Sequence, residues 1–342
     1  MILKRGLFSL GFLLLLALFL QSGQKKEGVI ENYTKLISDL SVEDVLLKLG
    51  DKEPLHYIQN LNQDSVKMGY DLISTGRIKN SKNKKQSKFF VCMDCHNVIP
   101  EVSDLADESP AARIKFGKEK GIAFLPASTF YGMYNKTNWY NGDYAKKYGS
   151  LVEPTRDTLV NAIQLCATQC SQGRKMDNWE VRAILHYYKS ISLQVKDLKM
   201  TSKEMDRLTK NVINKDKGGI KLLKSKFNTI NDATFGHTEI PVIEGYEPNL
   251  DNGQYIFNNG CLHCHGSGNN VTNFEFDDND LTMSFLESQI SKYSHFSVPK
   301  LVRKGTYAIA GKKAYMPQYP LEKMSREQLL DLLGYISKNK SN

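Results

Sequence analysis

Apolar residues recur at a helical spacing along several stretches of the chain, and small polar residues stand where these stretches begin. Ser41 precedes a short amphipathic segment that runs to Leu49 and that Gly50 ends. Thr201 and Glu204 have the spacing of a capping box at the start of another such segment. Side-chain caps mark helix N-termini, and glycine marks helix C-termini. The pattern therefore predicts helices at both places.

Three longer segments, residues 156–170, 178–191 and 325–336, are also amphipathic. In the second, Ala183, Ile184 and Tyr187 recur every three or four residues, which is the period of one helix face. The third follows a capping serine at the C-terminal end of the chain. With these segments the whole chain is predicted to be all-α.

Two similar helix signals lie far apart in the chain and indicate two related domains. The first begins at Asp64 and contains Gly69, and the second begins at Asp251 and contains Gly253. A pentapeptide with two cysteines starts 23 residues after Gly69 but only 8 residues after Gly253. The extra residues of the first copy are rich in lysine, as expected of an exposed loop. We expect two helical domains, the first enlarged by loop insertions.

Both copies carry the same cysteine-histidine pattern. The pentapeptides are Cys92-Met93-Asp94-Cys95-His96 and Cys261-Leu262-His263-Cys264-His265. C-x-x-C-H is the attachment sequence of c-type haem, in which both thiols form thioethers and the histidine binds iron. The alternative to haem attachment is a zinc site or a disulfide whose cysteines precede a histidine by chance. We predict two covalently bound haem c groups, with thioethers from Cys92, Cys95, Cys261 and Cys264 and axial ligands from His96 and His265.

The sixth ligand of the iron is expected to differ between the two sites. Met316 is the expected ligand in the second domain, because proline and the predicted helix over residues 325–336 follow it. We call this helix and the one predicted over residues 178–191 the closing helices of the two domains. Aligning them pairs Tyr187 with Tyr335 at an offset of 148 residues. At that offset the counterpart of Met316 is Thr168, which cannot replace it as a sulfur ligand.

Thr168 stands between Cys166 and Cys170, the two cysteines outside the pentapeptides. A thiolate is a strong iron ligand that lowers the potential, so either cysteine could bind the first iron. Their spacing on a helix also allows a disulfide. The remaining alternatives are Met133, Met176, His186 or no protein ligand. The sequence leaves these alternatives open.

Composition and charge bear on the compartment and the partner. The chain has 342 residues with 41% apolar content, which is ordinary for a globular protein. Residues 1–23 combine Lys4 and Arg5 with a leucine-rich run from Leu7 to Leu20, typical of a signal peptide or an N-terminal membrane anchor. The formal net charge of +9 favours docking to an acidic redox partner. No nucleic-acid motif is present, so nucleic-acid binding is not expected.

Two stretches resemble known families. The second pentapeptide, the Met316-Pro317 pair and the closing helix resemble class I cytochrome c over residues 248–342. The stretch from Asn161 to Arg174 is distantly similar to dihaem thiosulfate dehydrogenases and related sulfur-oxidising cytochromes. In that family a helix cysteine ligates the catalytic haem, and the resemblance places this role on Cys166. Cys170 and the aromatic insertion before Cys166 depart from that family's pattern.

These features together predict the domains and the function. The expected domains are residues 24–200 for the first haem, 201–247 for a connection and 248–342 for the second haem. The leading hypothesis is a dihaem c-type cytochrome that transfers electrons in a periplasmic or membrane-associated redox chain. The alternative is an oxidoreductase that acts on a small sulfur compound at a His/Cys-ligated haem, with Cys166 as the catalytic residue.

Overall fold

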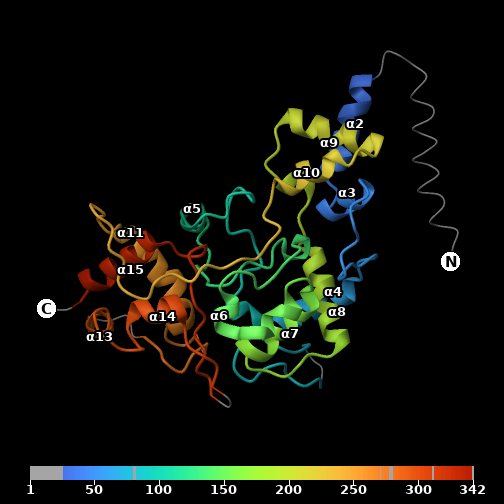
Figure 1. The fold of residues 1–342 in the computed structure, drawn as a ribbon. Coiled ribbons are helices and arrows are strands. Elements are labelled where there is room, and N and C mark those ends of the chain that lie inside the picture. Colours follow the sequence, from blue (N-terminus) through green and yellow to red (C-terminus); the bar gives the residue numbers. More distant parts are fainter. Residues whose placement is uncertain (1–25, 80–81, 270, 277–279, 310–311, 341–342) are drawn as a thin grey trace. The chain divides into compact units, whose positions relative to one another are not determined.

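The computed structural model describes residues 26–79, 82–269, 271–276, 280–309 and 312–340 (Figure 1). These residues form α-helices, short 3-10 and π-helical turns and isolated β-bridges, but no β-strand. The all-α prediction is confirmed. Residues 1–23, where an export signal or anchor is predicted, lie outside the described residues. Among the helices that are described, none combines the length and the apolar character that a membrane span requires.

The first of two compact units combines the chain up to Asp51 with Gln194–Leu223. Its helices are α2 (Lys26–Ser38), α3 (Val42–Lys48), α9 (Ser202–Asn214) and α10 (Gly218–Lys224). Ser41 caps α3, since its Oγ accepts a hydrogen bond from the Asp44 N–H at 3.0 Å. Thr201 and Glu204 form a capping box on α9. Both predicted helix starts are therefore confirmed.

The second unit combines Lys52–Leu193 with Lys224–Asn342 and holds both cysteine pentapeptides. From its N-terminal part come α4 (Gln63–Thr75), α5 (Pro110–Lys120), α6 (Tyr144–Tyr148), α7 (Leu159–Leu165) and α8 (Asn178–Ser190). From its C-terminal part come α11 (Leu250–Ile256), α12 (Leu262–His265), α13 (Asp280–Ser288), α14 (Val298–Lys304) and α15 (Arg326–Lys338). The two parts each build a hydrophobic core of their own.

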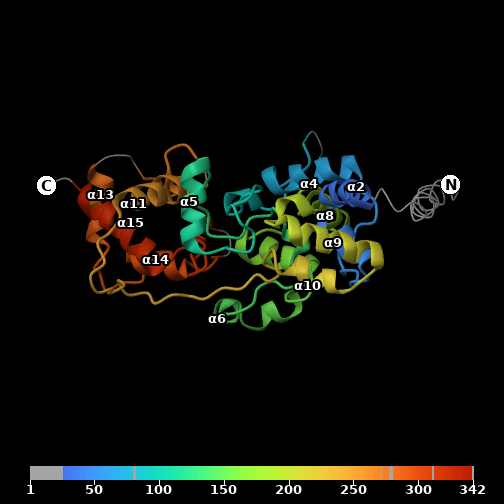
Figure 2. The ribbon, with the colours of Figure 1, turned by 90° about the horizontal axis from the view of Figure 1, so that it is seen from above.

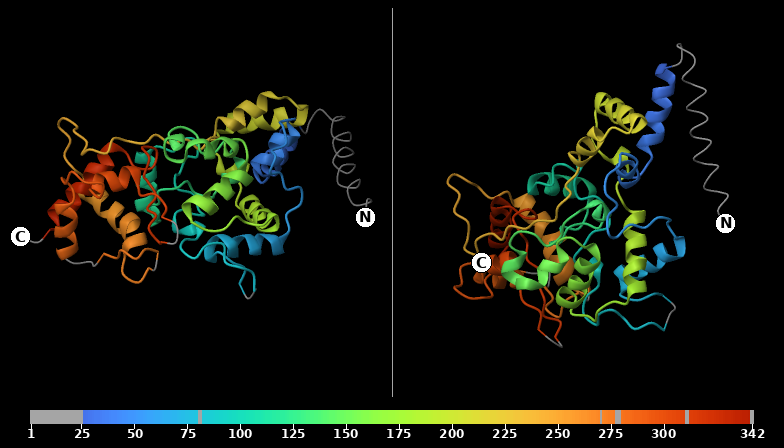
Figure 3. Two further views of the ribbon diagram at one scale, coloured as in Figure 1. Left: turned by 60° about the horizontal axis from the view of Figure 1, so that its bottom comes forward. Right: turned by 45° about the vertical axis from the view of Figure 1, so that its right-hand side comes forward.

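Two helix pairs in this unit pack in the same way. α4 packs along α8, and α11 packs along α15 (Figure 3). The contact is made by a glycine in each case: Gly69 lies against Ala183 and Tyr187, and Gly253 lies against Asp331 and Tyr335. A Cβ atom at either glycine would overlap the facing backbone carbonyl, so only glycine allows this approach.

The facing residues of the two pairs are separated by 148 residues, which is the offset inferred from the sequence. Ala183 and Tyr187 thus correspond to Asp331 and Tyr335 in space as well as in sequence. The glycine-mediated crossing shows that each pentapeptide follows the first helix of an equivalent helix pair.

The segment predicted as one helix over residues 156–170 is divided. A 3-10 turn, Gly149–Thr155, contains Pro154 and precedes α7. α7 then passes into a π-helical turn, Cys166–Cys170, which widens the helix at the two cysteines. π-Turns of this kind often occur at functional sites because they reorient the side chains that they carry.

The two parts of the second unit exchange segments. α5, from the region after the first pentapeptide, lies beside α11 and α15 (Figure 2) and contributes Ile114 to the second core. The Gln328 side-chain amide donates to the Pro110 carbonyl at 2.7 Å. In return, residues 229–233 pair with the first part, where the Thr137 N–H donates to the Thr229 carbonyl at 2.7 Å. The two pentapeptide regions are therefore held in one interlocked unit.

Candidate haem-binding sites

The histidine of each pentapeptide is held in the same way. His96 Nδ1 lies 2.6 Å from the Ser128 carbonyl oxygen, and His265 Nδ1 lies 2.6 Å from the Phe274 carbonyl oxygen. A carbonyl oxygen only accepts hydrogen bonds, so Nδ1 carries the proton and Nε2 keeps its lone pair. This is the arrangement that iron-binding histidines have in proteins.

Each ring is also stacked on a phenylalanine. His96 lies over Phe130 with ring centroids 4.2 Å apart, and His265 lies over Phe276 at 4.5 Å. Burial lowers the pKa of His96 to about 4, although its hydrogen bond to Ser128 acts in the opposite direction. The imidazole of His96 is therefore neutral at physiological pH and free to bind a metal.

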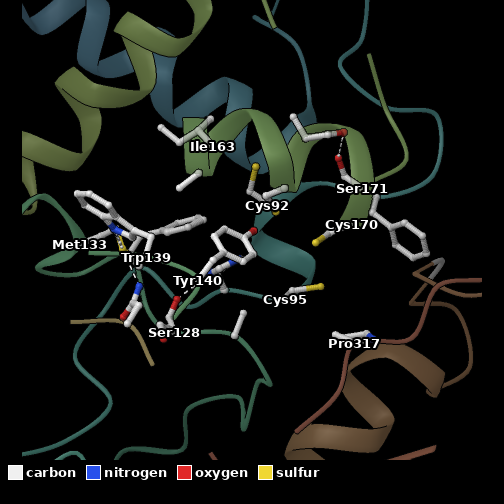
Figure 4. A pocket seen from close by; sticks show the side chains of 18 of the residues that line it. Cys92, Cys95, Ser128, Met133, Trp139, Tyr140, Ile163, Cys170, Ser171 and Pro317 are labelled. Carbon is white, nitrogen blue, oxygen red and sulfur yellow. Dashed lines mark hydrogen bonds between the residues drawn. The ribbon is translucent and has the colours of Figure 1, made fainter. Parts of the chain in front are cut away.

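A cavity opens beside the first pentapeptide (Figure 4). Cys92, Cys95 and His96 line it, and aromatic and aliphatic side chains from α7, α8 and the 139–148 segment form its walls. The set of two thiols, a neutral imidazole and an apolar enclosure matches what a haem c requires. These residues could hold such a group in the first part of the unit.

Cys166 and Cys170 line the same cavity. The structure places no disulfide between them, and a hydrogen bond joins their sulfurs. The π-turn carries both into the lining of the cavity that Cys92 and Cys95 also line.

Hydrogen bonds distinguish the two thiols of this pair. The pKa of Cys170 is lowered to about 6, chiefly by its hydrogen bond with Cys166 and, against burial, by the hydroxyls of Tyr148 and Tyr315. The pKa of Cys166 is raised well above its usual range by the same hydrogen bond and by burial. Cys170 is thus the more stabilised thiolate of the two.

The other predicted alternatives have different surroundings. The Met133 sulfur accepts hydrogen bonds from Trp139 Nε1 and Asn231 Nδ2, both at 3.3 Å. Met176 is buried in the first core and also borders the cavity. His186 is buried on α8, where its Nδ1 accepts a hydrogen bond from the Asn62 N–H at 3.3 Å, and it is not among the residues that line the cavity.

Two residues near the cysteine pair have strained backbones. Tyr140, in the cavity wall, has a φ of 55°, and Gln172, two residues after Cys170, has a φ of 54°. Both amide atoms of Gln172 are buried and have no hydrogen-bond partner among the described residues. Left-handed backbone in a non-glycine residue costs on the order of 1 kcal/mol and concentrates at functional sites. The sequence alone did not reveal this strain.

Met316 lies on the loop between α14 and α15. The loop is fixed by Thr306, whose N–H donates to the Met316 carbonyl at 2.8 Å and whose Oγ1 accepts from the Met316 N–H at 2.7 Å. Tyr315 and Pro317, on either side, line the first cavity, but Met316 is not among its lining residues. Gln318 lines the cavity as well, so Met316 is the one residue of the 315–318 stretch outside its lining.

The two pentapeptides touch each other. The Cys264 Sγ lies 3.9 Å from the Asp94 carbonyl oxygen. His263 also interacts with Asp94, whose charge and backbone act to raise the histidine's pKa while burial, the larger effect, lowers it. His263 was not predicted to take part in the site, although its position between the two attachment cysteines of the second pentapeptide could have indicated it.

Comparison with known proteins identifies the C-terminal region. Residues 248–336 match the family model described as "Cytochrome C oxidase, cbb3-type, subunit III". The second pentapeptide therefore lies in a cytochrome c domain, which implies covalently bound haem c and a role in electron transfer. Searches of curated proteins and of solved structures gave no match to the chain.

Proposed function

We propose that the protein is a dihaem c-type cytochrome, which passes electrons between one haem c on Cys92 and Cys95 and another on Cys261 and Cys264. The second attachment site lies in the matched cytochrome c domain. The first has an equivalent helix pair and an equivalently held histidine. Bound haem supplies a one-electron couple at each site.

The observation that carries the proposal is the contact between the attachment loops. The Cys264 sulfur and the Asp94 carbonyl oxygen are 3.9 Å apart, and Asp94 stands directly before the attachment residue Cys95. Thioether bonds would attach one porphyrin to Cys95 and the other to Cys264. The two porphyrins would therefore be attached on either side of this one contact. The exchanged α5 and 229–233 segments keep this contact fixed.

The chain's own residues then set the properties of each site. Ser128 and Phe274 fix the tautomers of the two iron-binding histidines. Cys166 or Cys170 would supply a thiolate to the first iron, whereas Met316 would supply a thioether to the second. A thiolate lowers the potential and a thioether raises it, so electrons would move from the first site towards the second.

We further propose that the protein is exported, either to the periplasm or to the outer face of the cytoplasmic membrane, because haem c is attached outside that membrane in bacteria. The excess of basic residues would favour a redox partner with an acidic docking surface. If so, the rate of electron exchange falls as ionic strength rises.

Haem content tests the proposal directly. The intact mass of the exported protein should correspond to two attached haems, and the double variants C92A/C95A and C261A/C264A should each retain one. In the wild type, an electron introduced at one haem should redistribute to the other within the same molecule, at a rate that does not depend on protein concentration. One haem per wild-type chain, or a concentration-dependent rate, would reject the proposal.

A second candidate function is oxidation of a small sulfur compound at the first haem. The observation that favours it is the cavity, in which a cysteine pair faces the attachment residues among aromatic side chains. Cys166→Ala should then alter the spectrum and potential of the first haem and abolish turnover of the sulfur compound. A variant with the wild-type spectrum and potential would remove this candidate.

A further inference from the structure

The 144–148 helix lies between the cavity of the first site and the loop of the second. The Tyr148 hydroxyl is 3.6 Å from the Cys170 Sγ and 2.9 Å from the Tyr315 hydroxyl. Cys170 belongs to the cysteine pair of the first site, and Tyr315 directly precedes Met316 of the second. One tyrosine hydroxyl thus connects Cys170, a predicted ligand of the first iron, with the residue next to Met316, the predicted ligand of the second iron.

Lys147, the preceding residue, strengthens this connection. Its Nζ donates to the Gln318 side-chain oxygen at 2.7 Å and to the Lys304 carbonyl at 3.0 Å. The same ammonium lies 5.2 Å from the centre of the Tyr315 ring, within the range of a cation–π interaction. The 315–318 loop is therefore attached to α6 at several points, and α6 reaches Cys170 through Tyr148.

We propose that Tyr148 is a positioning residue that couples the sixth-ligand sides of the two haem sites. Its hydroxyl holds the Cys170 sulfur on one side and the Tyr315–Met316 loop on the other. A change of ligand or position at Cys170 therefore alters the loop that carries Met316, and the reverse holds by thermodynamic reciprocity. This inference rests on the proposed dihaem function and goes beyond it, because two haems can exchange electrons without sharing ligand geometry.

Both potentials should respond to the loss of this hydroxyl. In Tyr148→Phe the thiolate of the first site loses a hydrogen-bond donor, and its stronger donation to iron lowers that potential. The Met316 loop loses an anchor, so methionine ligation weakens and the second potential also falls. Tyr315→Phe removes the same Tyr148–Tyr315 hydrogen bond from its other end and should lower the second potential similarly.

A double-mutant cycle separates coupling from independent effects. If the two hydroxyls act through one shared hydrogen bond, the shift of the second potential in Y148F/Y315F is no larger than in either single variant. Tyr307→Phe is the matched control. Tyr307 lies 67% exposed, with Lys147 Nζ 5.6 Å from its ring, so this variant keeps the ring contact and removes a hydroxyl outside the cluster.

The experiment is a potentiometric titration of the haem-loaded full chain, followed by visible and EPR spectra that report each haem. The inference predicts that Y148F changes the EPR signal of the first haem and lowers the second potential, whereas Y307F changes neither. If both haems are attached but Y148F and Y315F leave the second potential unchanged, or their shifts simply add, the coupling is wrong. If the wild type holds only one haem, the proposed function itself fails, which is a different result.

Discussion

At the scale of single residues, equivalent contacts prepare the two histidines for the same task. A backbone carbonyl binds Nδ1 of each, and a phenylalanine ring covers each imidazole. The sequence predicted the histidines from the pentapeptide but not Ser128 or Phe274, because no local pattern shows which distant carbonyl will face a ring nitrogen. We expect the sites to differ in the opposite ligand, which is predicted to come from the cysteine pair in one and from Met316 in the other.

Met316→Ala tests the predicted difference between the sixth ligands. Loss of the thioether should lower the midpoint potential of the second haem by on the order of 0.1 V, since axial ligands set potentials over a range of about 0.8 V. The first haem should keep its spectrum, because Met316 does not line the first cavity. A redox titration with optical detection measures both effects. An unchanged second potential would show that another residue is the ligand.

At the scale of elements, helix starts and stops were predictable because capping is local. Ser41, Thr201 and Ser325 cap helices where expected. The closing helices α8 and α15 begin and end within a few residues of the predicted bounds. The segment over residues 156–170 was predicted less well, because the α-helix begins only at Leu159 and a π-turn replaces its C-terminal end. A π-turn has no distinct apolar period, and tertiary contacts around the cysteines decide it.

The close crossing of α4 and α8 at Gly69 can be tested by substitution. Gly69→Ala should destabilise the protein by about 1–3 kcal/mol, because the added methyl overlaps the Ala183 carbonyl and forces α4 away from α8. Lys67→Ala, on the exposed side of the same helix, should change stability by less than about 0.5 kcal/mol. Chemical denaturation measures both. Equal stabilities of the two variants would contradict the close crossing.

At the scale of the whole second unit, the exchange of segments was not predictable. Ser109, Pro110 and Gly121 are start and stop signals for α5, but they do not say that this helix packs into the second core. Burial in that core depends on residues more than a hundred positions away. The exchange matters because it fixes the two attachment loops against each other.

A buried ion-pair cluster, Glu101 with Arg113 and Lys323, joins the exchanged segment to the loop before α15. Burial alone would raise the pKa of Glu101, but the two cations and the hydrogen bonds from Arg113 and Asn97 lower it to about 2. A lowered folded-state pKa stabilises the protein above the unfolded pKa of about 4.5, and this contribution is lost as the pH falls towards 2.

Ionised Glu101 should therefore make the folded protein about 3 kcal/mol more stable at neutral pH than it is with Glu101 protonated. Glu101→Gln should lower the free energy of unfolding at pH 7 by about 3–5 kcal/mol, since it leaves Arg113 buried without its partner. It should also flatten the pH dependence of stability between about pH 4.5 and 2 relative to the wild type. The exposed Glu153→Gln is the control. Parallel pH profiles for wild type and Glu101→Gln would show that the cluster carries no such stabilisation.

We propose that one chain holds two haem c groups with unlike sixth ligands. An EPR spectrum of the fully oxidised, haem-loaded protein distinguishes the two, because each ferric ligand set has its own g-values. We expect two low-spin signals of equal spin count, one typical of histidine–thiolate and one of histidine–methionine ligation. A single signal that accounts for one haem per chain, or two identical signals, would rule this arrangement out.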